Sequence, residues 1–225
     1  MVRVPYPEDK ENFHKFNDIV TDEIPKALRQ TFKRMWDRKF GPLQPWDDSE
    51  AVRKSFAAKE GGTTKVPTNL SYEEWDCTAL FQATIFAQSF TLPDSFGHYK
   101  TLSDLYVKPL GLPRGAFHAS VVSSGGDYYE TVALAIDQLR LLRNLMSHPP
   151  KGELSEGTFN QYLQLVKDAF KALGLKTDEI DSIGSELGFP RSEVADLERK
   201  VAKLERRIQN RDMVIGVGIG VILLE

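Results

Sequence analysis

Arg143, Asn144 and His148 place a fixed positive charge, an amide and a titratable imidazole within six consecutive residues. An arginine forks onto phosphate oxygens, and a histidine can act as general acid or base near neutral pH. For RNA, the 2′-hydroxyl supplies the nucleophile, so these groups suit phosphodiester chemistry without a metal. We therefore take Arg143, His148 and Asn144 as candidate catalytic residues, and Arg140 and Ser147 as candidate substrate-binding residues.

The same residues also have a structural interpretation. Arg140, Arg143 and His148 fall in the last third of a predicted helix, and the next two residues are prolines that would end it. The helix macrodipole stabilises cations near a helix C-terminus by a few tenths to about 1 kcal/mol. The residues from 143 to 148 alone therefore do not decide between a catalytic and a structural role.

Composition limits the chemistry further. The four histidines show no ligand spacing and the single cysteine, Cys77, makes no CxxC motif, so we expect no metal and no cofactor. A lone cysteine forms no intramolecular disulfide, and the N-terminus carries no apolar signal segment, which favours an intracellular, cytoplasmic protein. The net charge of -3 gives no general attraction for nucleic acid, so any RNA contact would be local.

The hydrophobic periodicity predicts helices and no convincing strand. Five helices are expected in a compact all-α bundle over residues 8–175, followed by a short helix and linker over 176–191. Their predicted starts are Thr21, Ser49, the capping box at Ser71, Asp127 and Ser155. The third helix should be central because it is apolar almost all round and continues to Pro93. Residues 91–126 are expected to be irregular.

Residues 192–212 repeat apolar side chains at heptad spacing, in the order Val194, Leu197, Val201, Leu204 and Ile208. Valine or isoleucine at position a with leucine at position d favours a parallel coiled-coil dimer. Fewer than three heptads are marginal, however. A helix folded back on the bundle remains an alternative to self-association.

The segment 213–225 is apolar up to its final glutamate, and six basic residues and one acidic residue lie between positions 199 and 211. Basic residues beside an apolar run are typical of the cytoplasmic flank of a membrane segment. Twelve apolar residues would span only about 18 Å as a helix, against roughly 30 Å of hydrocarbon. We expect either a truncated transmembrane segment that anchors the protein to a membrane or a simple apolar tail.

Beyond residues 143–148, motifs in a fixed order resemble those of one subgroup of the HEPN superfamily (higher eukaryotes and prokaryotes nucleotide-binding). The resemblance covers about residues 10–175. The subgroup is known from the DAZ-interacting, RNA-binding zinc-finger ubiquitin ligase. The similar stretches are Ala27-Leu28-Arg29-x-x-Phe32, the run from Trp75 to Phe81, Ala135-Ile136-x-x-Leu139-Arg140-x-x-Arg143-Asn144-x-x-x-His148, Phe159-x-x-Tyr162 and Ala172-Leu173-Gly174.

The resemblance implies a HEPN-like helical bundle that binds RNA or protein partners, in proteins linked to innate immune or stress signalling. HEPN nucleases pair two subunits, so that two Arg-x4-6-His helices form a composite site. They cut RNA without a metal and leave a 2′,3′-cyclic phosphate. Carried over, Arg143 would stabilise the phosphate, His148 would be the acid/base group and Asn144 would support them.

Two functions follow as hypotheses. The first is a HEPN-type RNA-binding domain, working as a homodimer through the HEPN helix and the coiled coil and able to act as a metal-independent endoribonuclease. The second is a non-catalytic dimerising adaptor or scaffold tethered to a membrane. The predicted coiled coil agrees with both, because a composite site and a scaffold each need two copies.

Overall fold

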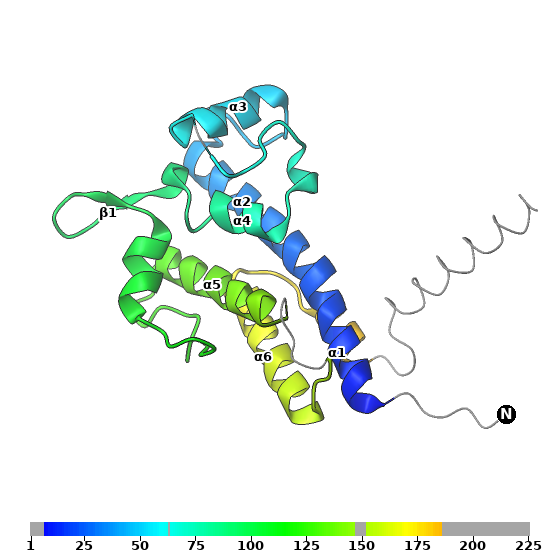
Figure 1. The fold of residues 1–225 in the computed structure, drawn as a ribbon. Coiled ribbons are helices and arrows are strands. Elements are labelled where there is room, and N and C mark those ends of the chain that lie inside the picture. The colour runs from blue at the N-terminus through cyan, green and yellow to red at the C-terminus, as the bar shows by residue number, and fades with distance from the viewer. Residues whose placement is uncertain (1–6, 63, 147–151, 186–225) are drawn as a thin grey trace, which may run out of the picture.

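The computed structural model describes residues 7–62, 64–146 and 152–185, and in this part of the chain the protein is mostly helical. The chain begins with α1 (Glu8–Asp18), which continues through a π-helical turn (Ile19–Glu23) into α2 (Ile24–Phe40). These three pieces form the long diagonal rod in blue in Figure 1. The rod then serves as the surface on which the other elements pack.

The prediction that Thr21 begins a helix is wrong, because the helix is already formed thirteen residues earlier at Glu8. The Thr21 hydroxyl donates to the carbonyl of Asn17, 3.0 Å away, and so caps nothing. Pro25 explains the π-turn. Its ring crowds the carbonyl four residues earlier and it has no N–H to donate, so the helix widens at this point, with the Ile24 N–H bonding to Ile19.

The second predicted helix is confirmed as α3 (Glu50–Lys59). The Ser49 hydroxyl accepts a hydrogen bond from the backbone N–H of Val52, at 3.3 Å, and so caps the first turn. Gly61 and Gly62 follow the helix with φ angles of 82° and 79°, which side chains other than glycine rarely adopt. The sequence signals at both ends of this helix were therefore sufficient to predict where it begins and ends.

The long central helix predicted from Ser71 to Pro93 is wrong in extent. Ser71 opens only a short 3-10 turn (Tyr72–Glu74), and the true helix is α4 (Cys77–Ala83), capped by Asp76 through a 2.7 Å bond from the Ala79 N–H. It stops at Thr84, where φ is -113° and ψ is -90°. The apolar run after Ser71 therefore belongs to several short buried elements rather than to one long helix.

Residues 91–126 are largely irregular, as predicted, but the structure adds some regular elements. A hairpin pairs β1 (Leu92–Pro93) antiparallel with β2 (Tyr99–Lys100), and it projects at the left of Figure 1. A π-helical turn (Ser103–Val107) and a 3-10 turn (Lys108–Leu110) follow. Such two-residue strands leave the fold class all-α.

The C-terminal half of the described chain contains α5 (Tyr128–Met146), α6 (Glu156–Ala172) and α7 (Asp178–Ser185). The predicted caps are confirmed: Asp127 Oδ1 accepts from the N–H groups of Tyr129 and Glu130, and Ser155 Oγ accepts from that of Thr158. α5 packs on α6, and α7 packs on α1 and α6 with Ile180 and Ile183 buried. α7 is thus part of the same packed unit.

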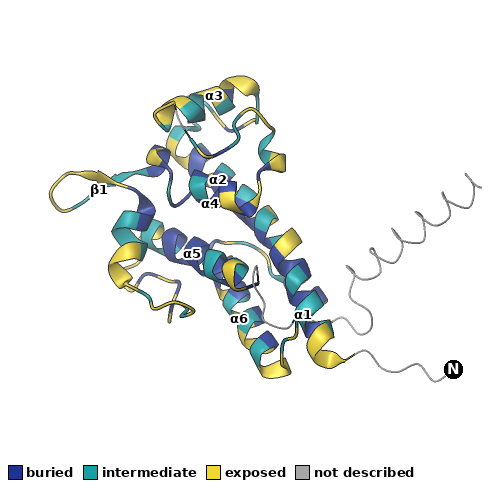
Figure 2. Ribbon diagram, in the orientation of Figure 1, coloured by how far each residue is buried: buried dark blue, intermediate teal, exposed yellow. Residues whose placement is uncertain are grey.

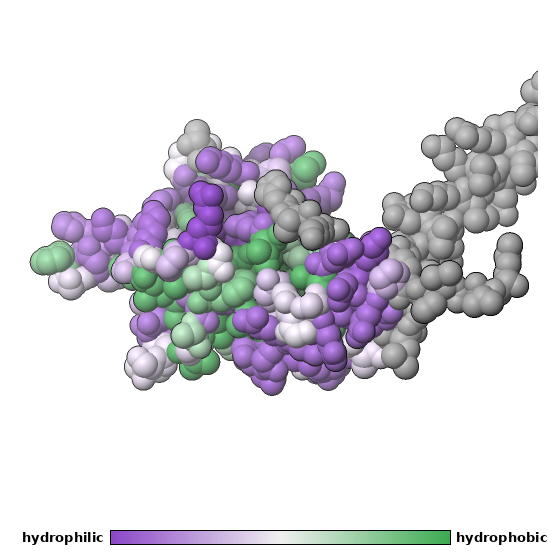
Figure 3. All heavy atoms as spheres, turned by 60° about the horizontal axis from the view of Figure 1, so that its bottom comes forward, coloured by the Kyte–Doolittle hydropathy of each residue, from purple (hydrophilic) through white to green (hydrophobic). Residues whose placement is uncertain are grey.

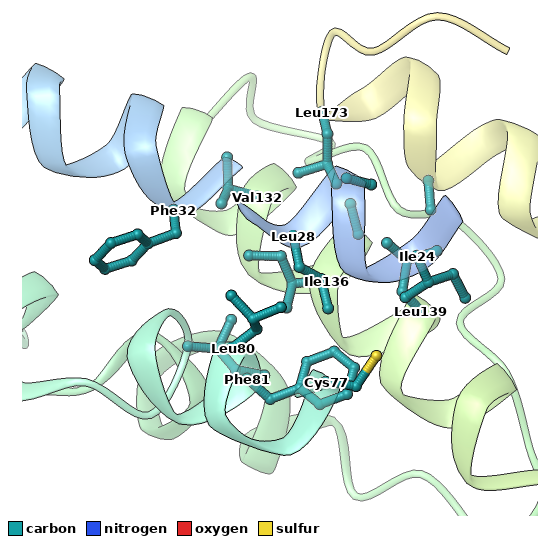
Figure 4. Packing of buried hydrophobic residues seen from close by; sticks show 14 of the residues in the cluster. Ile24, Leu28, Phe32, Cys77, Leu80, Phe81, Val132, Ile136, Leu139 and Leu173 are labelled. Carbon is teal, nitrogen blue, oxygen red and sulfur yellow. The ribbon is translucent and has the colours of Figure 1, made fainter. Parts of the chain in front are cut away.

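One apolar core joins these elements, and Figure 2 shows the buried residues along their inward faces. At the α3 end, Phe32 of α2 is fully buried, and its ring contacts the rings of Trp36, Trp46, Phe56, Trp75 and Phe90. Figure 4 shows the adjoining part of the core, where Leu28 of α2 lies among Leu80 of α4 and Ile136 of α5. α5 is therefore held rigidly by packing along its apolar face.

The predicted coiled coil at 192–212 and the apolar segment at 213–225 lie outside the described residues. Among the helices that the structure does describe, none combines the length and the apolar character needed to cross a bilayer.

Candidate functional site

The last turn of α5 presents part of the predicted site at the surface. Leu142 and Met146 are buried and fix this turn on the core, whereas Arg143 is half-buried and Asn144 is exposed. Arg143 Nη1 lies 3.4 Å from Asn144 Oδ1, so the guanidinium and the amide are neighbours. Ser147 and His148 lie outside the described residues. The structure thus brings two of the three candidate catalytic residues together and leaves the imidazole unplaced.

Arg143 lines a cavity of about 640 Å³ between the π-turn, α2, the start of α4 and the end of α5. The charged groups that line it are of both signs and include Lys26 and Arg29 as well as Asp22, Glu74 and Asp76. This cavity can hold a phosphate only where the cations outweigh the carboxylates.

The two other basic groups of this cavity are partly engaged. Arg29 donates from Nη2 to the carbonyl of Trp75 at 3.1 Å, which ties α2 to the start of α4. Lys26 pairs with Glu23 at 2.6 Å, an interaction that raises the pKa of the lysine. Arg143 is the third basic residue of the lining and the one that α5 contributes.

Cys77 also lines this cavity but is not a nucleophile. Burial raises the pKa of its thiol to about 11, and the positive charge of Arg143 offsets this only in part. A thiol with such a pKa stays protonated at neutral pH, and the protonated form is unreactive. The cavity therefore offers charge and hydrogen bonds rather than covalent chemistry.

Asn144 and Arg140 face a different cavity, of about 670 Å³, which lies between α5 and residues 103–117. The end of α5 consequently separates two cavities, with Arg143 on one side and Arg140 and Asn144 on the other. Within one copy of the chain, Arg140 and Arg143 do not converge on one cavity.

Arg140 is tied into a polar cluster that sequence reasoning missed. Asp137 is buried, with 1% of its surface exposed, and its Oδ1 accepts from Arg140 Nε at 2.7 Å. Its Oδ2 lies 2.8 Å from His118 Nε2, and the imidazole must donate because a carboxylate only accepts. The backbone N–H of His118 donates in turn to Gln138 Oε1 at 2.9 Å. The cluster fixes the segment around His118 to α5.

Burial by itself would raise the pKa of Asp137, but the hydrogen bonds from His118 and Arg140 outweigh burial and leave that pKa lowered. Asp137 is therefore ionised at neutral pH. The His118 side chain is 2% exposed, so it is not placed to abstract a proton from a dissolved substrate. We assign this histidine and aspartate to structure rather than to catalysis.

No sequence signal pointed to this cluster. Asp137 precedes Arg140 by three positions, an ordinary spacing for an exposed helical ion pair, and His118 lies in a segment without periodicity. In the part of the chain that the structure describes, no group of three or more histidine, cysteine or acidic side chains is placed to hold a metal ion.

A scan against protein-family models, a search of the curated proteins and a search of the solved structures found no match to this chain.

Proposed function

We propose that this protein is a HEPN-type RNA-binding domain, and that the end of α5 contacts the RNA backbone. One observation carries the proposal: Arg143 and Asn144 lie side by side at the surface, on a turn anchored by buried Leu142 and Met146. A guanidinium beside an amide supplies several donors to one phosphate. The resemblance of residues 135–148 to HEPN motifs supports the same assignment.

Charge explains why Arg143 would matter most. The C-terminal end of a helix carries partial negative charge and by itself repels a phosphate. The whole chain is acidic, with a net charge of -3, and so adds no general attraction. An arginine at this end must therefore supply the local attraction, and its loss should weaken binding to any RNA sequence.

Cleavage is the finer part of the proposal. Arg143 would stabilise the negative charge that builds up on the phosphate, and Asn144 would orient the phosphate. His148 would act as the acid/base group that takes the proton of the 2′-hydroxyl. The resemblance to HEPN nucleases implies that a complete site needs a second copy of α5 opposite the first. The heptad at 192–212 is the segment of the sequence suited to bring two copies together.

Binding can be tested by fluorescence anisotropy with a labelled single-stranded RNA over a range of salt concentrations. We expect Arg143→Gln to weaken binding about tenfold, the effect of about 1.4 kcal/mol for one charge-assisted contact, and to reduce the salt dependence. Lys54→Gln is the matched control, because Lys54 of α3 is 74% exposed and pairs with Glu50 on the surface of the same helix. Equal affinities for wild type and Arg143→Gln would refute the proposal.

Cleavage needs its own assay, with a mixed RNA in EDTA and both Arg143→Ala and His148→Ala. We expect the wild type to leave 2′,3′-cyclic phosphate ends and both variants to be inactive while unfolding at wild-type urea concentrations. If the wild type binds RNA but does not cut it, the domain is a binding module and the nuclease part of the proposal fails.

A further inference from the structure

The cavity beside Asn144 has the lining of a ligand pocket. It measures about 670 Å³ and opens to solvent between α5 and residues 103–117. Its apolar wall is formed by Phe86, Val107, Leu112, Phe117, Leu141 and Leu145. Figure 3, which brings the lower side of Figure 1 forward, shows hydrophobic residues gathered left of centre among hydrophilic ones. Pockets of this size with mostly apolar walls and few polar groups are typical of small-molecule sites.

The charges around this pocket favour an anion. Three basic residues line it, namely Lys108, Arg114 and Arg140, against one acidic residue, Asp137. Both oxygens of Asp137 already accept hydrogen bonds, from His118 and Arg140. Asp137 therefore has little capacity left to accept a hydrogen bond from a ligand, and the ion pair with Arg140 offsets its charge.

After the ion pairs are taken into account, the positive charge that lines the pocket is close to one unit. Lys108 Nζ lies 2.5 Å from Asp104 Oδ1, so these two charges offset each other, as do those of Arg140 and Asp137. Arg114 is exposed, and within the described part of the chain no ion pair involves it. One uncompensated arginine matches a carboxylate, which carries one negative charge, better than a phosphate monoester, which carries about 1.5 to 2.

We propose that this pocket binds a small amphiphile with an alkyl chain and a single carboxylate, the chemistry of a fatty acid. The chain lies against the apolar wall, and the carboxylate takes the fork of Arg114 at the mouth. Each buried methylene contributes roughly 0.8 kcal/mol, so the chain supplies most of the affinity and the arginine selects the head group. The pocket shares Asn144 with the proposed RNA contact, but the argument for this ligand does not rest on that contact.

The test is isothermal titration calorimetry of the full chain with dodecanoate below its micellar concentration. Parallel titrations use dodecanol, dodecyltrimethylammonium and dodecyl phosphate. We expect dodecanoate to bind about tenfold more tightly than dodecanol and more tightly than dodecyl phosphate, and the cationic amphiphile to bind least. No binding of dodecanoate, equal binding of all four, or a preference for the phosphate would overturn the proposal.

Variants locate the binding. Arg114→Gln, in an exposed loop, should bring the affinity for dodecanoate down to that for dodecanol. Leu145→Asp should weaken both, because Leu145 lines the wall. Leu43→Asp is the control, since Leu43 is 96% exposed and is not part of the pocket. Wild-type binding by both Arg114→Gln and Leu145→Asp would show that the amphiphile binds elsewhere and would overturn the assignment.

Discussion

Replacing Asp137 by asparagine should destabilise the fold, because this carboxylate holds two elements together. Its Oδ1 accepts from Arg140 of α5 and its Oδ2 accepts from His118 of the preceding segment. Hydrogen bonds to charged groups contribute about 1.5 to 3 kcal/mol each. The asparagine side chain keeps one acceptor oxygen, so it can accept from only one of the two donors. Its NH2 group then faces the other donor, and that hydrogen bond is lost.

The cost depends on which donor loses its acceptor. The Arg140 side chain is 29% exposed and can turn to water, whereas the His118 side chain is 2% exposed and cannot. One lost hydrogen bond to a charged group costs up to about 3 kcal/mol, and the new N–H group of asparagine has no acceptor there, so we expect the variant to lose about 3 kcal/mol. For a protein of this size that corresponds to a fall in Tm of roughly 6 to 12 °C.

The loss is measured by urea unfolding followed by circular dichroism. Asp168→Asn on α6 is the control, because Asp168 is exposed and accepts from the side chain of Gln164 one turn earlier, so it should change stability by less than about 0.5 kcal/mol. A loss below about 1 kcal/mol for Asp137→Asn would refute the view that the cluster stabilises the fold.

The dependence of the unfolding free energy on pH gives a second test of the cluster around Asp137. The pKa of Asp137 is lowered in the folded protein, so its ionised form stabilises the fold above the ordinary aspartate range, near 4. That contribution is lost as the pH falls through the lowered pKa. The difference in unfolding free energy between wild type and Asp137→Asn should therefore be full at neutral pH and shrink below about pH 4.

Two other predictions concern the core and the capping of α4. Phe32→Ala should cost about 3 to 5 kcal/mol in urea unfolding, because Phe32 is fully buried among five aromatic rings, while Phe96→Ala in the hairpin, where Phe96 is 84% exposed, should cost almost nothing. Asp76→Ala should cost about 1 kcal/mol because it removes the cap on the Ala79 N–H, and an unchanged stability would show that α4 is held by packing alone.

The sequence predicted the helices whose ends carry capping residues and whose apolar side chains repeat on one face. α3, α5 and α6 are therefore found where Ser49, Asp127 and Ser155 placed them. The prediction failed where tertiary packing decides the local conformation. The run after Ser71 is apolar on all sides, so its periodicity could not show that the helix stops at Thr84. Pro25 is compatible with the first turn of a helix that begins at Thr21. It is equally compatible with the π-turn that precedes it in the structure, so the proline did not distinguish the two.

For the site, the sequence correctly placed Arg143 and Asn144 near the end of a helix, which the structure shows as α5 ending at Met146. It could not show that the two residues face different cavities, because that depends on what packs on each side of α5. It also gave no sign that Arg140 is paired to a buried aspartate. A contact between residues nineteen positions apart, such as that of His118 with Asp137, has no local signature.

The most direct measurement of the central claim is a map of where RNA touches the protein. Ultraviolet crosslinking of a uridine-rich RNA to the full chain, followed by mass spectrometry of the crosslinked peptides, gives that map. We predict crosslinks in peptides that contain the last turn of α5, around Arg143 and Asn144, and their loss in Arg143→Gln. Crosslinks confined to other elements, or unchanged by Arg143→Gln, would contradict the account.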